Sequence, residues 1–226
     1  MVKFMSKNFA ATNTIDWSNF NSSLVIEVTR PNGVSICSGV AVNEDTVLTA
    51  AHCLEGIILK VRVFTDSCYN AKSNKNYGVK NFELHPEYDS ASSNYKCDIA
   101  KIKLSETLPE EINYLPIIKD GKKISGQITR LGFGARADKN IRTMITPEFK
   151  TVRTHEKTLE LNDTYSYSGD SGGPVFLQFQ GQMYLVAIHS TLSFGPEGKH
   201  SFNPLLSSHK EWINDEVMEA LEAMTA

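Results

Sequence analysis

Residues 166–176 read SYSGDSGGPVF, which places a serine between a Gly-Asp pair and two further glycines, with a proline directly after them. Glycine is costly in a helix or a strand because it loses more backbone freedom on folding than any other residue. Its use here predicts a tight loop that leaves backbone N–H groups pointing into open space. The serine of this loop, Ser171, could act as a nucleophile if the rest of the chain supplies a base.

The size and composition of the chain are those of a globular protein. Its 226 residues are 41% hydrophobic, enough for a core in one large or two small domains. The formal net charge of −3 argues against nucleic acid or a membrane surface as a partner. The sequence contains no run of about 18 apolar residues, so it does not predict a transmembrane helix. The first residues lack the apolar stretch of a signal peptide, which leaves a cytosolic protein or a mature chain with an added Met1.

Short apolar runs separated by turn residues recur along the chain. Pro31-Asn32-Gly33 is a turn signal between two such runs, at 23–29 and 34–42. Further strands are predicted at 46–50, 57–64, 99–104, 127–134, 174–179 and 183–190. Many of these residues are β-branched and each run has the length of a strand, which favours an all-β sandwich or barrel.

The C-terminal residues change to a helical pattern. Apolar residues recur at roughly helical spacing from Trp212 to Met224, and Ser208 with Glu211 fits a capping box. The pattern predicts a helix over 208–223 that packs against the second half of the β structure.

The cysteine pattern bears on the cellular compartment. The four cysteines are Cys37, Cys53, Cys68 and Cys97, and none form a C-x-x-C motif, which argues against a structural zinc site. An even number fits two disulfides in an oxidising compartment. The alternative is four buried thiols in a cytosolic protein.

A nucleophilic serine needs a base, usually a histidine, and a third group that orients the base. His52 lies in LTAAHC, where an apolar strand meets a loop, and Asp98 opens the apolar strand of CDIAKIKL. Each residue alone is ordinary, because a histidine beside a cysteine is more often structural and an aspartate before a strand is more often a turn residue.

The motifs LTAAHC, DIAKIKL and GDSGGP occur in the order His, Asp, Ser, and together they resemble the trypsin/chymotrypsin-type serine proteases. ICSGVAV, LGFG and LLSSHKEWI resemble other segments of that family, so the resemblance covers nearly the whole chain. It implies an all-β fold of two perpendicular six-stranded β-barrels with a C-terminal α-helix and an active site between the barrels. We expect one peptidase unit over 1–226, with the first barrel at 15–115, the second at 116–205 and the helix at 206–226.

The resemblance also implies the roles of the catalytic residues. His52 would take the proton from Ser171 and return it to the leaving amine, while Asp98 would fix the tautomer and stabilise the imidazolium. The N–H groups of Gly169 and Ser171 would form the oxyanion hole, and Ser190 would support the aspartate. The expected activity is that of a serine endopeptidase working through an acyl-enzyme. The alternative is a protease-like binding protein or toxin without general proteolytic activity.

The family closes a disulfide across the histidine loop, and Cys37 and Cys53 fall at these positions. A second bond, Cys68–Cys97, is predicted because Cys97 directly precedes the aspartate and the bond would anchor the acid as the first anchors the base. The family's disulfides around the specificity pocket are absent, which is a departure toward bacterial members. These features predict a secreted or periplasmic protein.

Many members of the family are zymogens, in which cleavage frees an amine that pairs with the aspartate before the nucleophile, here Asp170. Val2 and Ile15 are the candidates for such an N-terminus, and the segment that begins at Val2 resembles the bacterial, staphylococcal-type glutamyl endopeptidases. The alternative is that local hydrogen bonds satisfy Asp170 and that no processing is needed.

The specificity pocket is expected to be rich in hydroxyl groups. Tyr165 stands where trypsin-like members carry an aspartate, so cleavage after Arg or Lys is not expected. The predicted substrate-binding residues are Tyr165, Ser166, Ser168, His189, Ser190, Thr191 and Leu192.

His189 occupies the position where bacterial glutamyl endopeptidases carry a histidine that receives the substrate carboxylate. A buried carboxylate needs a charged or hydrogen-bonding partner, which a histidine can provide. The resemblance therefore predicts cleavage after Glu, then Asp. Two alternatives remain open: His189 is a core residue satisfied by a neighbouring hydroxyl, or Leu192 narrows the pocket and gives an elastase-like preference for small apolar residues.

No cofactor and no metal ion are expected, and a chelator should leave activity intact, because 65–83 lacks the acidic pair of the trypsin calcium loop. The expected partners are protein or peptide substrates, without nucleic acid or membrane, and the chain is expected to be a monomer. Four histidines outside the motifs are expected at the surface: His85, His155, His200 and His209.

Overall fold

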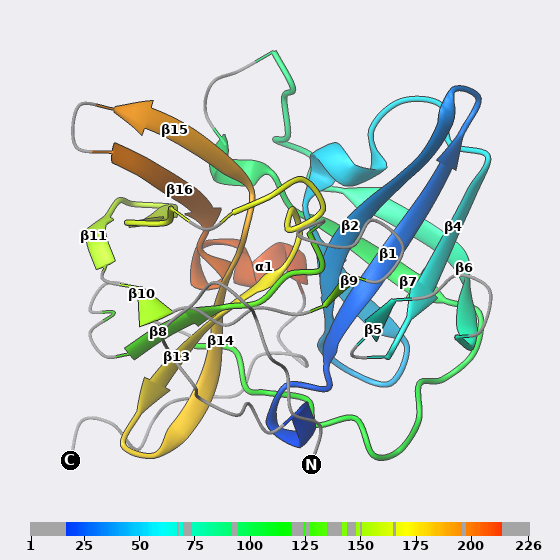
Figure 1. The fold of residues 1–226 in the computed structure, drawn as a ribbon, viewed down its shortest axis with the longest axis horizontal. Coiled ribbons are helices and arrows are strands. Elements are labelled where there is room, and N and C mark those ends of the chain that lie inside the picture. The colour runs from blue at the N-terminus through cyan, green and yellow to red at the C-terminus, as the bar shows by residue number, and fades with distance from the viewer. Residues whose placement is uncertain are drawn as a thin grey trace.

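The computed structural model describes residues 17–66, 68–69, 74–91, 95–118, 124, 127–134, 142–143, 148–149, 151–164, 166–195 and 198–213. β-Strands are the dominant secondary structure of the described chain, which forms two halves, and a short helix follows the last strand (Figure 1). The predicted all-β class is therefore confirmed. Val2, Ile15 and Tyr165, which figure in the predictions, lie outside the described residues.

Six strands of the first half close into a barrel in the order β1-β2-β3-β7-β6-β4, and every neighbouring pair is antiparallel. They are β1 (Ser23–Arg30), β2 (Gly33–Ala41), β3 (Thr46–Thr49), β4 (Lys60–Phe64), β6 (Asn76–Leu84) and β7 (Ala100–Leu104). Arg30 pairs with Gly33, so Pro31 and Asn32 form the two-residue turn that the sequence predicts.

The second half contains two four-stranded sheets, β10-β8-β13-β14 and β11-β12-β16-β15. The strands are β8 (Gln127–Arg130), β10 (Glu148–Phe149), β11 (Thr151–Thr154), β12 (Thr158–Leu161), β13 (Pro174–Phe179), β14 (Gln182–Ile188), β15 (Thr191–Gly195) and β16 (Gly198–Pro204). A separate pair joins β5 (Cys68–Tyr69) to β9 (Arg142–Thr143).

The chain connects the two sheets of the second half directly. One residue separates β10 from β11, and only His189 and Ser190 separate β14 from β15, so each of these pairs is one run of chain that passes between the sheets. A bridge between Ala187 and Leu205 also links the sheets. The described strands thus follow the order of a six-stranded barrel whose hydrogen bonding is interrupted at these two points.

The C-terminal helix begins through a 3-10 turn, η5 (Leu206–His209), which leads into α1 (Lys210–Ile213). Residues after 213 lie outside the described chain, and so does most of the predicted helix. The predicted capping box is wrong, because Ser208 is already inside the 3-10 turn and its hydroxyl donates to the carbonyl of Glu156. The other 3-10 turns are η1 (Trp17–Asn19), η2 (Ala51–Leu54) and η3 (Tyr95–Cys97). Among the described helices, none has the length and apolar character that crossing a membrane requires.

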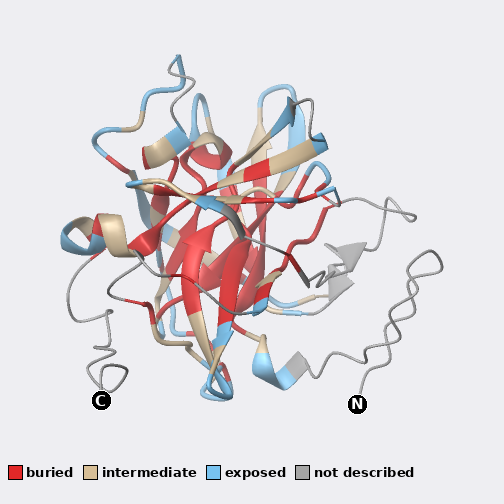
Figure 2. Ribbon diagram, turned by 90° about the vertical axis from the view of Figure 1, so that its left-hand side faces the viewer, coloured by how far each residue is buried: buried red, intermediate tan, exposed pale blue. Residues whose placement is uncertain are grey.

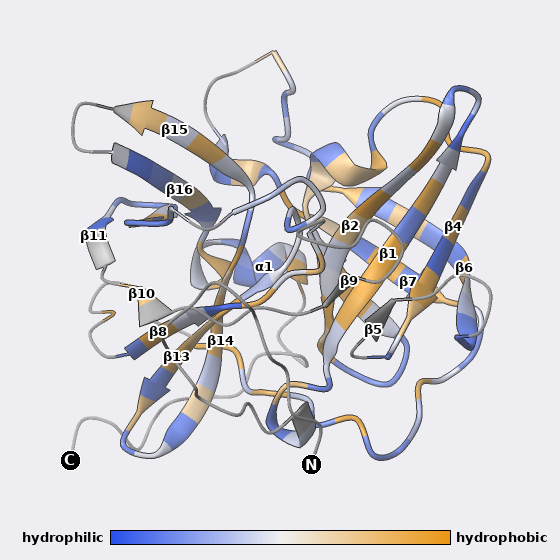
Figure 3. Ribbon diagram, viewed as in Figure 1, coloured by the Kyte–Doolittle hydropathy of each residue, from blue (hydrophilic) through white to orange (hydrophobic). Residues whose placement is uncertain are grey.

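Buried residues lie along the strands at the centre of the molecule (Figure 2), and strands such as β1 are rich in hydrophobic residues (Figure 3). One cluster fills the first barrel and another lies within the second half. A third joins the halves, because Leu48 and Phe64 of the first pack with Leu131 and Phe176 of the second. This shared core fixes the position of one half against the other.

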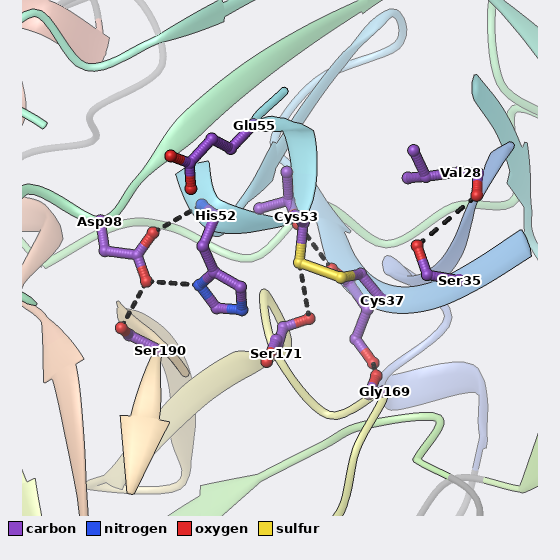
Figure 4. The surroundings of a disulfide bond; sticks show 12 residues. Val28, Ser35, Cys37, His52, Cys53, Glu55, Asp98, Gly169, Ser171 and Ser190 are labelled. Atoms are coloured by element: carbon purple, nitrogen blue, oxygen red, sulfur yellow. Dashed lines mark hydrogen bonds and ion pairs between the residues drawn. A yellow bond between two sulfur atoms is a disulfide. The ribbon is translucent and has the colours of Figure 1, made fainter. Parts of the chain in front are cut away.

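The predicted disulfide between Cys37 and Cys53 is present, with the two Cα atoms 6.3 Å apart (Figure 4). Cys37 lies on β2 and Cys53 in η2, directly after His52. The bond therefore ties the turn that carries His52 to a strand of the barrel.

The second predicted disulfide is wrong. Cys97 is a buried free thiol, and its Sγ donates a hydrogen bond of 3.4 Å to Oε2 of Glu87. Cys68 lies on β5, whose partner strand is β9, whereas Cys97 ends the turn η3. The prediction rested on the position of Cys97 beside Asp98 in the sequence, and that position does not indicate which group contacts the thiol.

Replacing both Cys37 and Cys53 with alanine should lower the free energy of unfolding by about 3 kcal/mol, because the bond closes a loop with a sequence separation of 16. Chemical denaturation of the two proteins measures the difference. Alkylation of the parent chain under denaturing, non-reducing conditions should modify Cys97 and spare Cys37 and Cys53. An unchanged stability, or a Cys97 that resists alkylation, would contradict this assignment.

Candidate active site

A cleft with a volume of about 440 Å³ is lined by residues of both halves. The first half contributes His52, Glu55, Tyr88, Asp89, Ser90, Tyr95 and Asp98, and the second contributes Ser166, Tyr167, Ser168, Ser171, His189, Ser190, Thr191 and Leu192. The cleft thus brings together the three predicted catalytic residues and every predicted substrate-binding residue that the structure describes.

His52 and Asp98 are joined by two hydrogen bonds (Figure 4). Nδ1 of His52 donates to Oδ2 of Asp98 at 2.7 Å, and the backbone N–H of His52 donates to Oδ1 at 2.9 Å. A neutral imidazole whose Nδ1 carries the proton presents Nε2 as an acceptor. The pair therefore fixes both the orientation of the ring and the nitrogen that is free to take a proton.

The Asp98 carboxylate also connects the two halves. Ser190, between β14 and β15, donates its hydroxyl to Oδ2 of Asp98 at 2.5 Å. Burial alone would raise the pKa of Asp98, but the hydrogen bonds and charge interaction with His52, together with the hydrogen bond from Ser190, hold it below its ordinary value. Asp98 is therefore an anion at neutral pH.

Ser171 lies on the side of the His52 ring that faces away from Asp98 (Figure 4). The glycines after it are required by close backbone contacts. A Cβ at Gly172, whose φ is +82°, would lie 2.2 Å from the carbonyl oxygen of Ser38, and one at Gly173 would lie 2.0 Å from a second carbonyl oxygen. No side chain fits at either position, so the serine loop can lie directly on the neighbouring backbone.

The peptide groups around Ser171 are held by Ser38 of β2. The Ser38 hydroxyl donates to the carbonyl of Gly169 at 2.8 Å, and the Ser38 N–H donates to the carbonyl of Ser171 at 2.8 Å. Gly169 has φ of +104°. Neither the N–H of Gly169 nor that of Ser171 donates to any acceptor in the described residues. Two such donors, two residues apart, are suited to binding an oxyanion.

A buried ion pair lies behind the serine loop. Arg130, at the end of β8, places Nη1 3.2 Å from Oδ2 of Asp170, and its Nε donates to Oδ2 of Asp163 at 2.8 Å. All three side chains are fully buried. Asp170 also accepts from the N–H groups of Gly134 and Tyr167. Sequence reasoning missed Arg130, although a charged residue inside an apolar strand is a signal that a buried partner exists.

His189 is buried and is hydrogen-bonded at both ring nitrogens. Nδ1 donates to the side-chain oxygen of Asn203 at 3.1 Å, and Nε2 accepts from the hydroxyl of Ser166 at 2.8 Å. Asn203 is oriented by its own amide nitrogen, which donates to the carbonyl of Leu159. Burial, and then the positive charge of Arg130, lower the pKa of His189 to about 4, so the ring is neutral at neutral pH.

Lys199 of β16 adds a positive charge beside the same wall. Its Nζ donates to the carbonyl of Ser166 at 2.9 Å and lies 6.0 Å from the ring centre of Tyr167. Sequence reasoning did not identify Lys199, because it is more than 30 residues from the segment that it contacts.

Two of the four histidines expected at the surface are buried instead. His85 and His209 contact each other, and burial lowers the pKa of both, that of His209 to about 4. The prediction fails because this cluster joins residues that are far apart in the sequence. His155 and His200 are partly exposed, and both pair with Glu160.

Comparison with known proteins places this geometry in a family. The family model described as Trypsin matches residues 17–213. CLIP domain-containing serine protease B4 of Anopheles gambiae is 25% identical over 88% of this chain and 67% of its own length. Vitamin K-dependent protein C of Mus musculus is 25% identical over 81% of this chain and 46% of its own length, so these relatives are longer proteins.

Among solved structures, the scabies mite inactivated protease paralogue S-I1 has a TM-score of 0.73 and 19% sequence identity, and the match covers 91% of this chain and 97% of that one. At this identity the likeness shows the fold alone. The family match, by contrast, spans most of the chain and includes all three motifs. The chain therefore belongs to the trypsin family and is a serine endopeptidase, a hydrolase of peptide bonds.

Proposed function

We propose that Ser171 is the nucleophile of this endopeptidase, that His52 is its general base and acid, and that Asp98 orients the histidine. The hydrogen bond between His52 and Asp98, with Ser171 on the opposite side of the ring, is the observation that carries the proposal. Ser171 Oγ attacks the substrate carbonyl while Nε2 of His52 takes its proton and passes it to the leaving amine. Water then hydrolyses the acyl-enzyme by the same steps in reverse order.

The N–H groups of Gly169 and Ser171 stabilise the oxyanion that forms during each attack. The hydrogen bonds from Ser38 support this role, because they hold both carbonyl groups of the loop and thereby orient its peptides. Removal of one such donor costs about 2.7–4 kcal/mol of transition-state stabilisation in another serine protease. The positions of the two donors are thus part of the catalytic machinery.

Replacing Ser171 with alanine should reduce kcat by about a millionfold and abolish covalent labelling by a fluorophosphonate, because the attacking oxygen is lost. Ser90 lines the same cleft, has no role in the proposed mechanism, and provides the matched control. Ser90→Ala should keep the label and most of the activity. Hydrolysis by Ser171→Ala would refute Ser171 as the nucleophile. A parent chain that neither cuts a protein substrate nor takes up the label would favour the protease-like binding protein instead.

Arg130 performs the role that a newly formed N-terminal amine has in zymogens of the family. That amine neutralises the aspartate before the nucleophile, and here the guanidinium of Arg130 already lies 3.2 Å from Asp170. Because Asp170 has a cation within the folded chain, the serine loop is ordered without a free amine from Val2 or Ile15. The chain is therefore active without N-terminal processing.

An Arg130→Met variant should lose about 3–5 kcal/mol of stability and most of its activity, since two buried carboxylates would be left without their cation. Arg153, an exposed arginine on β11, provides the control, and Arg153→Met should change neither property. Activity is compared at a temperature where each protein is folded. An extra peptide fused before Met1 should leave the parent chain active, and inactivity of that fusion would refute the role of Arg130.

The pocket prefers glutamate, then aspartate, before the scissile bond, as in the bacterial glutamyl endopeptidases. His189, the Ser166 hydroxyl and the nearby charge of Lys199 support this preference. In the free chain Nε2 of His189 accepts from Ser166, so a bound carboxylate must bring a proton to this nitrogen. An elastase-like preference is the alternative, because Leu192 also lines the cleft.

The ratio of kcat/KM for matched Glu and Gln peptides should fall as pH rises. Burial, and then the positive charge of Arg130, lower the pKa of His189 to about 4 in the free chain, while Asp163 and Asp170 oppose the shift. A bound carboxylate raises the pKa of His189. At a pH between the pKa of the free chain and that of the complex, Glu binding takes up one proton, so the affinity for Glu falls by up to about tenfold for each unit that the pH rises.

His189→Ala should bring the Glu/Gln ratio close to one at every pH. Leu192→Gly provides the control, because it widens the pocket without removing a hydrogen-bonding group and should leave the ratio unchanged. If the parent chain cuts Ala peptides as fast as Glu peptides, or if His189→Ala keeps the parent ratio, the acidic preference is wrong.

The disulfide between Cys37 and Cys53 supports action in an oxidising compartment, outside the cytosol. The natural partners in this proposal are protein or peptide substrates that enter the cleft between the two halves. The chain acts on them as a monomer, since a single chain carries every group of the proposed mechanism.

A further inference from the structure

A second cluster of chemically active side chains lies outside the proposed mechanism. His85 follows β6, Cys97 ends η3 and His209 ends η5, so three distant segments meet at this point. All three side chains are buried, and their ligand atoms lie within 4.8 Å of one another. Cys97 directly precedes Asp98 in the sequence, which places the cluster beside the turn that presents the catalytic carboxylate.

We propose that His85, Cys97 and His209 bind a zinc ion. Imidazole nitrogen and cysteine sulfur are the donors that zinc prefers in proteins. Nδ1 of His209 and Nε2 of His85 are 3.1 Å apart, against roughly 3.3 Å for two nitrogens bound to one tetrahedral zinc ion. The rings are nearly perpendicular, with an interplanar angle of 76°, so the two imidazoles do not stack on each other. Sγ of Cys97 needs to move about 1 Å closer to the two nitrogens so that all three atoms can bind one zinc ion at its usual distances.

Groups around the cluster already hold the ligands in suitable orientations. Nε2 of His209 donates to the carbonyl of Lys96 at 2.8 Å, which leaves Nδ1 with a lone pair. A backbone carbonyl that accepts from the second ring nitrogen is a usual companion of a histidine that binds metal. Oε2 of Glu87 lies 3.4 Å from Sγ of Cys97 and can become the fourth ligand.

The competing interpretation is a network of hydrogen bonds without metal. Nε2 of His85 donates to Nδ1 of His209, while the N–H of Glu87 donates to Nδ1 of His85. Zinc binding moves the ring proton of His85 from Nε2 to Nδ1, and the N–H of Glu87 gives up its hydrogen bond. The thiol proton of Cys97 passes to solvent. No oxidation or reduction is involved, because zinc has no accessible redox chemistry.

The bound ion would connect the turn before Asp98 to the C-terminal segment. Cys97 belongs to η3 and His209 to η5, and the carbonyl of Lys96 in η3 already accepts from His209. A ligand that binds only the folded state stabilises it. Zinc should therefore raise the melting temperature of the chain, while the hydrolytic steps at Ser171 proceed without it.

The test measures zinc binding to the full chain, stripped of metal, with Ser171→Ala as background so that self-cleavage does not occur. One equivalent of zinc should bind and raise the melting temperature. Cys97→Ser and His209→Gln should each weaken zinc binding by at least about 100-fold, since loss of even an outer partner of a ligand costs 10 to 100-fold. His155→Gln, at a partly exposed histidine, is the matched control and should bind zinc normally.

Cobalt substitution gives a second measurement that needs no variant of the cluster. Cobalt bound by His85, Cys97 and His209 should show a thiolate-to-cobalt charge-transfer band together with the visible absorption of a tetrahedral ion. A chain that binds no zinc, zinc binding that survives both Cys97→Ser and His209→Gln, or a cobalt spectrum without the thiolate band would each overturn the proposal. Any of these results would leave the cluster as a hydrogen-bonded pair of neutral histidines beside a thiol.

Discussion

The buried carboxylate of Asp98 is the interaction on which the rest of this site depends. It accepts from the ring and backbone of His52 in the first half and from Ser190 in the second, so one anion holds groups of both halves in place. A buried charge requires such partners, because burial alone strongly disfavours the ionised form. The core shared by the two halves and the disulfide beside His52 keep these partners at hydrogen-bonding distance.

A second buried anion, Asp170, organises the other side of Ser171. Its cation is Arg130 of β8, and the loop that it anchors also rests on Ser38 of β2. Ser171 thus lies between two buried carboxylates, one paired with a histidine and the other with an arginine. In the proposed mechanism only the histidine exchanges a proton, which separates the role proposed for Asp98 from that of Asp170.

The sequence predicts what short motifs encode. The glycines of GDSGGP, the strand before His52 and the first disulfide are local features, and the structure has each of them. Arg130 and Lys199 were missed because their partners are more than 30 residues away, and no spacing rule relates them. The Cys68–Cys97 bond failed because the position of Cys97 beside Asp98 does not indicate that its thiol contacts Glu87. Residue spacing in the sequence could not predict the cluster of His85, Cys97 and His209, since the two histidines are 124 residues apart.

The most direct test of the central claim is a crystal structure of this chain with a peptide boronic acid that carries glutamate at the reactive end. Boron should be bonded to Oγ of Ser171, with one boronate oxygen within hydrogen-bonding distance of the N–H groups of Gly169 and Ser171. His52 should still donate Nδ1 to Asp98. An unmodified Ser171, or an imidazole turned away from Asp98, would contradict the account.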